Sequence, residues 1–295
     1  MAAIYQKARK KAGTIAIPFL ITILISLIVL GGVAYYFYGK LTDKTRELQP
    51  LKSATTSISS DDVNEILFVL KPDDTEHSQP AVMLFRFDPV RKQEFCVGIP
   101  LTLMLDHDGK DETVLQCLEN HGVTSLRTDL SKLLDQPIAR YISMNSTGFQ
   151  KLVSLIGNVS YVVTIKDRDL RPSEVSEELE PSQLEMLLTS LKYNTEVERN
   201  SVIGFAVASM LNQCSGQRIA SNLDGYFKAV INQVTTDVTA QDFSTHRHAI
   251  SYVFENASSP ARGVTLSMEQ DGDCLRLAKG TVEALKVTFS QKSAG

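Results

Sequence analysis

The sequence predicts an α/β protein: a layered α/β/α domain with a mixed central sheet, preceded by one N-terminal transmembrane helix. Short apolar runs of strand length alternate along the chain with segments whose apolar residues recur at helical spacing. That alternation is typical of a sheet whose two faces are covered by helices. Ahead of it, residues 12–39 carry no charge, and this run is longer than the ~20 apolar residues that cross a bilayer.

Residues 12–39 are expected to be an uncleaved membrane anchor. A cleaved signal peptide has an apolar core of ~7–15 residues followed by small residues, whereas this segment is longer and ends in four aromatic residues at 35–38. The tail before it, residues 1–11, contains cations and no acid: Lys7, Arg9, Lys10 and Lys11. The positive-inside rule therefore places this tail in the cytoplasm and the rest of the chain outside a cell membrane that it crosses once.

The charge balance restricts the partners of the exported part. The whole chain has a net charge of −4 and a pI near 5.8, which argues against nucleic acid as the main partner. Without the four cations of the tail, the remainder carries −4 − 4 = −8. An anionic ligand would therefore have to be held by local cations.

The cysteines leave two alternatives open. Cys96, Cys117, Cys214 and Cys274 all follow the predicted anchor, and an even number in an oxidising compartment permits two disulfides. Buried free thiols fit equally well, because Cys96 lies inside an apolar strand pattern and a domain of this size needs no covalent cross-links. There is no C-x-x-C pair, so local motifs do not support zinc or thioredoxin-type chemistry.

The elements of the exported part follow in order. Residues 40–62 are polar with a Ser/Thr-rich end and are interpreted as a stalk, followed by a domain over residues 63–295. Continuous apolar or β-branched runs predict strands at residues 65–70, 81–87, 93–99, 139–144 and 159–165. Apolar residues at helical spacing predict helices at 126–134, within 145–158, at 181–191, at about 197–212, through 223–234, and from a capping box at Thr239 and Asp242.

Composition and short motifs indicate little chemistry. His246 and His248 are two residues apart on a predicted helix, so they point to different faces and are poorly placed for a shared metal. The polar loop from Asp73 to His77 could bind a cation, but a solvated loop between strands explains it as well. The chain contains no Gly-rich phosphate loop and no G-x-S-x-G nucleophile motif.

One region resembles a known family. Residues 138–163 read IARYISMNSTGFQKLVSLIGNVSYVV, and they are similar to the LytR-CpsA-Psr family of bacterial envelope proteins. That family has, in this order, a strand, a helix that starts with Asn-x-x-Gly-Phe, the pattern LV-x-x-(I/L)-G-x-V, and a second strand. Three further segments resemble the family's first three strands: EILFVL with the nearby Asp73 and Asp74, VMLFRFDP, and CVGIP. Residues 221–243 resemble the family's late helix pair. The resemblance covers most of residues 63–245.

The resemblance implies a fold and an activity. It implies an α/β/α domain outside the cytoplasmic membrane, with a deep apolar pocket for a polyprenyl chain. In the family, arginines hold the lipid pyrophosphate, an aspartate helps to bind Mg²⁺, and a glycopolymer is transferred to peptidoglycan. Cations that neutralise developing charge, together with positioning, supply most of the rate enhancement in such phosphoryl transfer.

Most of the family's charged site positions are changed in this chain. The aspartate position is Pro80, between Gln79 and Ala81, and the arginine position after Ile-Pro is Leu101. The paired arginines fall near Lys192, the only cation there, while Arg199 matches an arginine that opens a helix. Each lost donor or cation typically removes ~3 kcal/mol of transition-state stabilisation, so the resemblance implies a vacated site.

Three functions follow from these observations. The first is a catalytically degraded binding or scaffolding module for cell-wall glycopolymer assembly, without a cofactor, that keeps a pocket for polyprenyl phosphate. The second is a divergent phosphotransferase that uses Mg²⁺ and a displaced charge set: Asp73, Asp74, Lys192 and Arg199. The third is a structural ectodomain without a lipid pocket. The vacated-site interpretation also requires that Gln79, Pro80, Leu101 and Leu103 lie together at the ends of adjacent strands.

Overall fold

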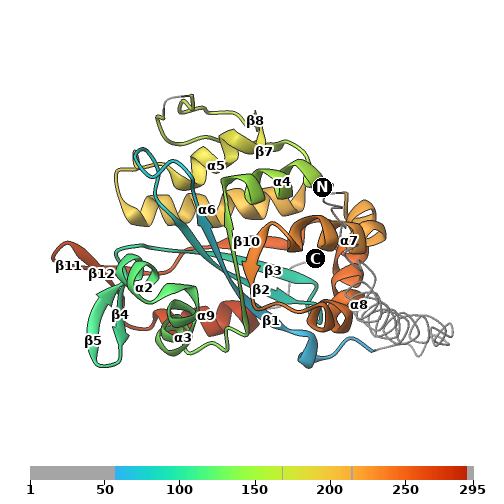
Figure 1. Ribbon diagram of the computed structural model, residues 1–295, viewed down its shortest axis with the longest axis horizontal. Helices are drawn as coiled ribbons and strands as arrows, with labels where there is room; N and C mark the ends of the chain where they lie inside the picture. The colour runs from blue at the N-terminus through green and yellow to red at the C-terminus, as the bar shows by residue number, and fades with distance from the viewer. Residues whose placement is uncertain (1–56, 168, 214, 291–295) are drawn as a thin grey trace, which may run out of the picture. The chain divides into compact units, whose positions relative to one another are not determined.

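The structure is a computed structural model, and it describes residues 57–290 apart from positions 168 and 214 (Figure 1). The predicted anchor at 12–39, and the predicted stalk up to residue 56, lie outside these residues. Within the described ranges, no helix is both long and apolar enough to cross a membrane. The compact unit that is described begins at Ser57.

A mixed six-stranded sheet forms the centre of the unit, in the order β10-β3-β2-β1-β6-β9. β1 pairs antiparallel with β2 and parallel with β6, so the sheet is mixed as predicted. β2 pairs antiparallel with β3, β3 parallel with β10, and β6 antiparallel with β9. The strands are β1 Asn64–Lys71, β2 Ala81–Asp88, β3 Gln93–Ile99, β6 Arg140–Asn145, β9 Val234–Thr236 and β10 Ala261–Val264.

The register brings four strand termini to one end of the sheet. Leu70 pairs with Ala81, Lys71 with Asn145, and Val82 with Ile99. The last residues of β1, β3 and β6 and the first residue of β2 therefore lie side by side, and we call this the Lys71 end. Because the loops after β3 and before β2 leave from this end, Pro80 and Leu101 are brought to it as well.

Helices cover both faces of the sheet (Figure 1). Side chains alternate along each strand, and the two faces bury separate apolar cores. One face packs against α2 Val114–Asn120, α3 Gly122–Leu134 and α9 Thr281–Ser290. The other packs against α4 Ser146–Ile156, α5 Pro181–Thr189, α6 Glu196–Asn212, α7 Gly216–Ile231 and α8 Ala240–Asn256.

Small elements complete the unit. A 3-10 turn, η1 Ser60–Asp62, precedes the sheet, and three two-stranded ladders lie beside it. They are formed by β4 Met104–His107 with β5 Lys110–Thr113, β7 Val159–Tyr161 with β8 Glu177–Leu179, and β11 Met268–Asp271 with β12 Cys274–Leu277. Of these ladder strands, only β7 lies in a predicted strand. The prediction was 159–165, and the observed strand ends at Tyr161, although Val163 and Ile165 beyond it are buried.

The apolar stripe at 223–234 was predicted as one helix and is two elements. α7 ends at Ile231, the chain turns, and Val234 pairs with Met144 in β9. Val230 of α7 and Val234 of β9 pack against the same apolar core. Val234 therefore has helical spacing from the residues of α7 although it lies beyond the end of the helix. The helix predicted at 181–191 likewise ends at Thr189, and its next residue, Ser190, is extended.

Candidate functional site

An apolar cavity of about 470 Å³ lies between the sheet and the helices α7 and α8. Its floor is the face of β1, β2 and β6 that carries Ile66, Phe85 and Ile142, and its roof includes Val230 and Ile250. The lining is almost wholly hydrophobic. This volume falls within the roughly 300–1,000 Å³ of ordinary ligand pockets, and apolar walls of this kind suit a hydrocarbon ligand.

Two helices form the roof without closing onto the floor. The apolar stripe of α7 faces inward, and Phe227 of α7 stacks on Phe243 of α8 with ring centroids 4.1 Å apart. Most of the lining residues of these helices are only partly buried, Val230 and Ile250 among them. A closed core would bury such side chains completely, so the stripe here lines a space that remains accessible.

A single acidic side chain interrupts the apolar wall at β3. Glu94 lines the cavity and is 1% exposed, and within the described residues its Oε2 atom has no hydrogen-bond partner. Burial raises the pKa of Glu94 to about 8. The group is therefore mostly a neutral carboxylic acid near neutral pH, and only in that form is its burial inexpensive.

Paired polar groups line the cavity near the starts of β1 and β6. Arg140 donates to both carboxylate oxygens of Asp242, at 3.1 Å and 2.9 Å. Asn64 lies 3.2 Å from the Nδ1 atom of His246, which also lines the cavity. His246 is thus anchored to the start of β1.

An open hollow of about 680 Å³ shares part of its wall with the cavity. The two spaces share Met144 and Val234 in their walls, and the hollow is bordered by Lys71 and Asn145 at the Lys71 end of the sheet. Lys71 is exposed there. The hollow also reaches Val123 and Thr124 of α3, which covers the other face of the sheet.

The predicted vacated positions meet at the Lys71 end. Arg199 donates through Nη2 to the backbone carbonyls of Pro80 and Leu188, the latter at 3.1 Å. Glu196 accepts the backbone N–H of Leu101 at 3.1 Å and the side-chain amide of Gln79 at 3.2 Å. The structure therefore brings Gln79, Pro80 and Leu101 into one neighbourhood. The side chains of Leu101 and Leu103 are both buried in the core that packs against α2, α3 and α9.

Arg199 is a buried structural arginine. Its side chain is 0% exposed, and its Nη1 atom lies 3.6 Å from Oε2 of Glu196. Burial lowers the pKa of Arg199 from its ordinary value, and the Glu196 carboxylate opposes that change. The guanidinium is held by protein groups on the inside of the domain, whereas the phosphotransferase alternative needs it to face a ligand.

Close contact between α6 and β3 fixes the Glu196–Arg199 pair over the strand ends. A Cβ atom at Gly98 would lie 2.2 Å from the carbonyl oxygen of Asn200, and one at Gly204 would lie 2.8 Å from that of Cys96. Only glycine permits helix and strand backbones to approach this closely. The glycine of the Cys-Val-Gly-Ile-Pro segment thus places the first turn of α6 on Leu101.

Three members of the phosphotransferase charge set contact other groups of the described residues. Asp74 pairs with His77 at 3.1 Å, and Lys192 lies 3.5 Å from Asp167. Asp73 is exposed, and its backbone N–H donates to Ser146. Across residues 57–290, positions 168 and 214 aside, no hydrogen bond or ion pair joins any two of Asp73, Asp74, Lys192 and Arg199.

The described cysteines are free thiols. Cys96 and Cys117 are buried and Cys274 is partly exposed, while Cys214 lies outside the described residues. Burial, with a smaller contribution from Glu94, raises the pKa of the Cys96 thiol well above its ordinary value. Cys96 is therefore an inert core residue, as one of the two sequence alternatives expects.

Comparison with known proteins shows the fold. No protein-family model and no curated protein matches the chain in sequence. A crystal structure of a candidate transcription regulator from Eubacterium siraeum is similar, with a TM-score of 0.67, 18% identity, and coverage of 81% of this chain and 96% of that one. At such identities the similarity establishes the class of fold only.

Two further structures identify that fold. TagV of Bacillus subtilis has a TM-score of 0.60 and 14% identity over 77% of this chain and 95% of its own. TagT bound to LI-WTA has a TM-score of 0.57 and 13% identity over 77% of this chain and 89% of its own. TagV and TagT are LytR-CpsA-Psr proteins, so this chain has the fold seen in that family.

Sequence reasoning gave no role to two acidic residues, Glu94 of the cavity wall and Glu196 at the Lys71 end. Glu94 was part of a predicted strand, and Glu196 directly precedes a predicted helix. Neither stands in a recognisable motif. For Glu94 the sequence did carry a signal, because it is the one charged residue of a seven-residue strand segment. A charged group inside a fully buried strand requires an explanation.

Proposed function

We propose that this chain is a membrane-anchored, extracytoplasmic module of LytR-CpsA-Psr type that binds a polyprenyl-linked lipid without transferring its glycopolymer. The observation that carries the proposal is the apolar cavity between the sheet and α7 and α8. It shares Met144 and Val234 with the open hollow beside Lys71. The hydrocarbon chain would occupy the cavity, and a phosphate head group would lie in the adjoining hollow. A role in cell-envelope glycopolymer assembly is supported by the fold shared with TagV and TagT.

The state of the Lys71 end supports binding without catalysis. Phosphoryl transfer requires cations aimed at the phosphoryl oxygens. Here Leu101 and Pro80 replace two charged positions of the resembled family, and Arg199 is committed to backbone carbonyls and Glu196. The Glu196 carboxylate would repel a pyrophosphate placed against it. Lys71 provides one exposed cation, enough to attract a head group but not to stabilise a transition state.

The anchor and orientation in the proposal come from the sequence. Residues 12–39 would hold the domain at the outer surface of the membrane, where polyprenyl-linked precursors are located. A nearby bilayer suits a protein that takes its ligand from lipid, because the ligand need not cross water. No nucleic acid and no cofactor is part of the proposal, and Mg²⁺ is part only of the phosphotransferase alternative.

Binding is tested with the full chain reconstituted in nanodiscs and titrated with polyprenyl phosphate and with the matching uncharged polyprenol. Val230→Trp would fill the cavity and is expected to abolish binding of both ligands. Val287→Trp makes the same change at an exposed position of α9 and should bind as the parent chain does. Absence of binding in the well-folded parent chain would leave only the structural-ectodomain alternative.

Two variants test the head-group contact and the enzyme alternative. Lys71→Ala should weaken binding of the phosphate several-fold and leave binding of the polyprenol unchanged, because only the phosphate meets the lysine charge. With Mg²⁺ and a polyprenyl-pyrophosphate substrate, the parent chain is expected to show neither transfer nor pyrophosphate hydrolysis. Turnover that disappears in Lys192→Ala would instead establish the phosphotransferase.

A further inference from the structure

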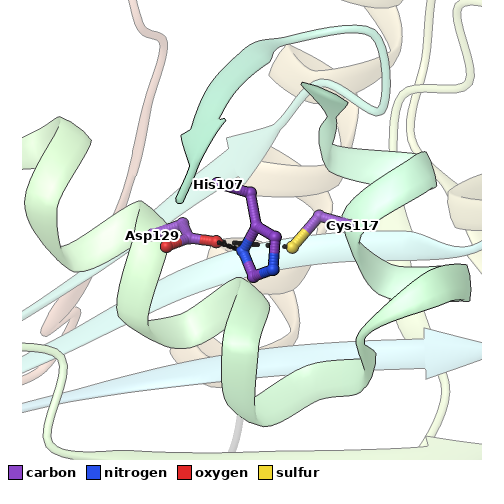
Figure 2. Close-up of side chains that lie close together, drawn as sticks. All are labelled: His107, Cys117 and Asp129. Atoms are coloured by element: carbon purple, nitrogen blue, oxygen red, sulfur yellow. Dashed lines mark hydrogen bonds and ion pairs between the residues drawn. The ribbon is translucent and has the colours of Figure 1, made fainter. Parts of the chain in front are cut away.

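A histidine, a cysteine and an aspartate from three elements meet on the side of the sheet opposite the cavity. His107 ends β4, Cys117 lies in α2 and Asp129 lies in α3. Figure 2 shows the three side chains pointing toward one another. One ligand atom from each residue lies within 4.8 Å of the other two. Cys117 and Asp129 are 12 positions apart, His107 and Asp129 are 22 apart, and the three form no recognisable motif, so the folded chain brings them together.

The distances match a metal site that is nearly formed. Nδ1 of His107 is 2.6 Å from Oδ2 of Asp129, and Sγ of Cys117 is 3.6 Å from the same oxygen. Around tetrahedral Zn²⁺, with bonds of about 2.0–2.3 Å, neighbouring donor atoms are roughly 3.2–3.8 Å apart. The Cys117–Asp129 separation already lies in that range, and the His107–Asp129 contact would open by about half an ångström to reach it.

The donor types select the class of ion. One nitrogen, one sulfur and one oxygen suit Zn²⁺ and Co²⁺, whereas Mg²⁺ prefers oxygen ligands alone. A thiolate and a carboxylate together cancel the charge of a dication, which favours a buried position. Cys117 is fully buried and the Asp129 side chain is 3% exposed, while the His107 side chain is 18% exposed and leaves one side open.

Neighbouring groups hold two of the three ligands in place. The other carboxylate oxygen of Asp129, Oδ1, accepts from Lys132 at 3.3 Å. The ring of His121 stacks on that of His107 with centroids 3.9 Å apart, and its Nε2 atom lies 3.1 Å from Glu112. Outer contacts of this kind orient ligands in metal sites and reduce the rearrangement that binding requires.

A nucleophilic cysteine is the competing interpretation, and the geometry disfavours it. An activated thiol requires contact with a general base and a lowered pKa. Cys117 instead donates to Asp129, the residue that also holds His107. Cys117 and Asp129 are also both buried, so a substrate would have no open approach to the thiol.

We propose that His107, Cys117 and Asp129 bind one Zn²⁺-type dication, with water as the fourth ligand. The bound ion would join the β4–β5 hairpin to α2 and α3. On binding, the thiol proton passes to solvent, and His107 changes tautomer so that Nδ1 presents its lone pair. No electron is transferred. The site is independent of the proposed lipid function, because its residues lie on the opposite face of the sheet from the cavity.

The test uses the full chain in detergent, stripped of metal with a chelator, kept reduced and titrated with Co²⁺. One equivalent is expected to produce thiolate-to-Co²⁺ charge-transfer absorption and the visible bands of tetrahedral Co²⁺. Zn²⁺ should bleach both signals and Mg²⁺ should not. A folded parent chain that gives no charge-transfer absorption would overturn the proposal.

Variants assign the signal to these three residues. Cys117→Ser should lose the charge-transfer absorption, while Cys274→Ser, which changes a partly exposed thiol elsewhere, should keep it. Asp129→Asn preserves side-chain volume and should weaken Co²⁺ affinity at least ~10-fold. Circular dichroism of each metal-free variant checks its fold, and Asp129→Asn decides the matter if Cys117→Ser does not fold. Absorption that persists in folded Cys117→Ser would assign the metal to another thiol and refute the site.

Discussion

Glu196 and Arg199 lie one turn apart on α6, with a carboxylate oxygen of the first 3.6 Å from a guanidinium nitrogen of the second. The pair also reaches outward to two other segments. Arg199 donates to the carbonyl of Pro80 before β2, and Glu196 accepts the N–H of Leu101 after β3. Charged groups at this position therefore connect a helix to two strand ends, and they are not available to a substrate.

Removal of Arg199 is expected to be strongly destabilising. Arg199→Ala would leave the carbonyls of Pro80 and Leu188 without their donor and Glu196 without its counter-charge. Loss of one partner from a buried pair typically costs about 3–5 kcal/mol. Urea unfolding of the full chain measures this loss. Arg247→Ala, which breaks a surface pair with Asp224, is the control and should cost under about 1 kcal/mol. Equal, small costs would contradict the structural role of Arg199.

Contact between α6 and β3 predicts an effect at Gly98. A methyl group there would meet the backbone of Asn200, so Gly98→Ala should cost roughly 1–3 kcal/mol or more through overpacking. Gly225→Ala is the matched control, since Gly225 lies in α7 with no atom within 4 Å of the added carbon. That change should be neutral or stabilising by up to about 1 kcal/mol. A stable Gly98→Ala protein would mean that α6 does not approach β3 so closely.

The central strands could be predicted because their signal is local. β1, β2 and β3 are continuous apolar runs bounded by polar loops, and the predicted ranges agree with the observed ones within a residue. The helix at 146–156 was equally clear, because Asn145 caps it and Gly157 ends it. These elements are determined by burial and by capping, both of which are visible in a short window.

The elements that were missed depend on weaker or tertiary signals. The β4–β5 hairpin turns at Asp108 and Gly109, with φ of 51° and 82°. This Asp-Gly pair is a strong hairpin signal, but the flanking strands have four residues each and no clear alternation. The three-residue β9 forms only because β6 offers it an edge. In the sequence, Val234 of β9 lies at helical spacing from the apolar residues of α7, so β9 was predicted as part of that helix.

The candidate sites were less predictable than the fold. A cavity exists where apolar side chains fail to fill a space, and no sequence pattern distinguishes that from a filled core. Arg199 was assigned from a helix-start position, although only the packed structure shows that its side chain turns inward. The His107, Cys117 and Asp129 cluster is assembled from three elements, and two of these were not predicted.

The orientation of the chain is a separate prediction from the sequence. Basic residues precede the apolar span at 12–39 and the tail contains no acid, so the domain should lie outside the cytoplasmic membrane. Protease added to spheroplasts is expected to digest the domain while a cytoplasmic marker protein stays intact. Digestion that begins only after lysis would reverse the orientation and remove the lipid-binding proposal from the outer surface.

Glu94 should make stability depend on pH. Its pKa is raised by burial from 4.5 to about 8, so the folded chain holds a proton that the unfolded chain releases. The contribution of Glu94 to stability is fully present below pH 4.5 and is lost as pH rises from there through about 8. Glu94→Gln mimics the protonated form, so its stability relative to the parent chain should increase over that range, by at most about 5 kcal/mol.

Urea unfolding of both chains between pH 5 and pH 9 measures this difference. The other ionisable groups of the cavity wall, Arg140, Asp242 and His246, are present in both chains and therefore cancel in the comparison. Glu255→Gln, at an exposed position of α8, is the control and should follow the parent profile at every pH. If the free energy of unfolding of Glu94→Gln also follows that of the parent chain at every pH, Glu94 ionises freely in the folded chain. The cavity wall would then be wetter than its apolar lining indicates, and a hydrocarbon ligand would be a poor fit for it.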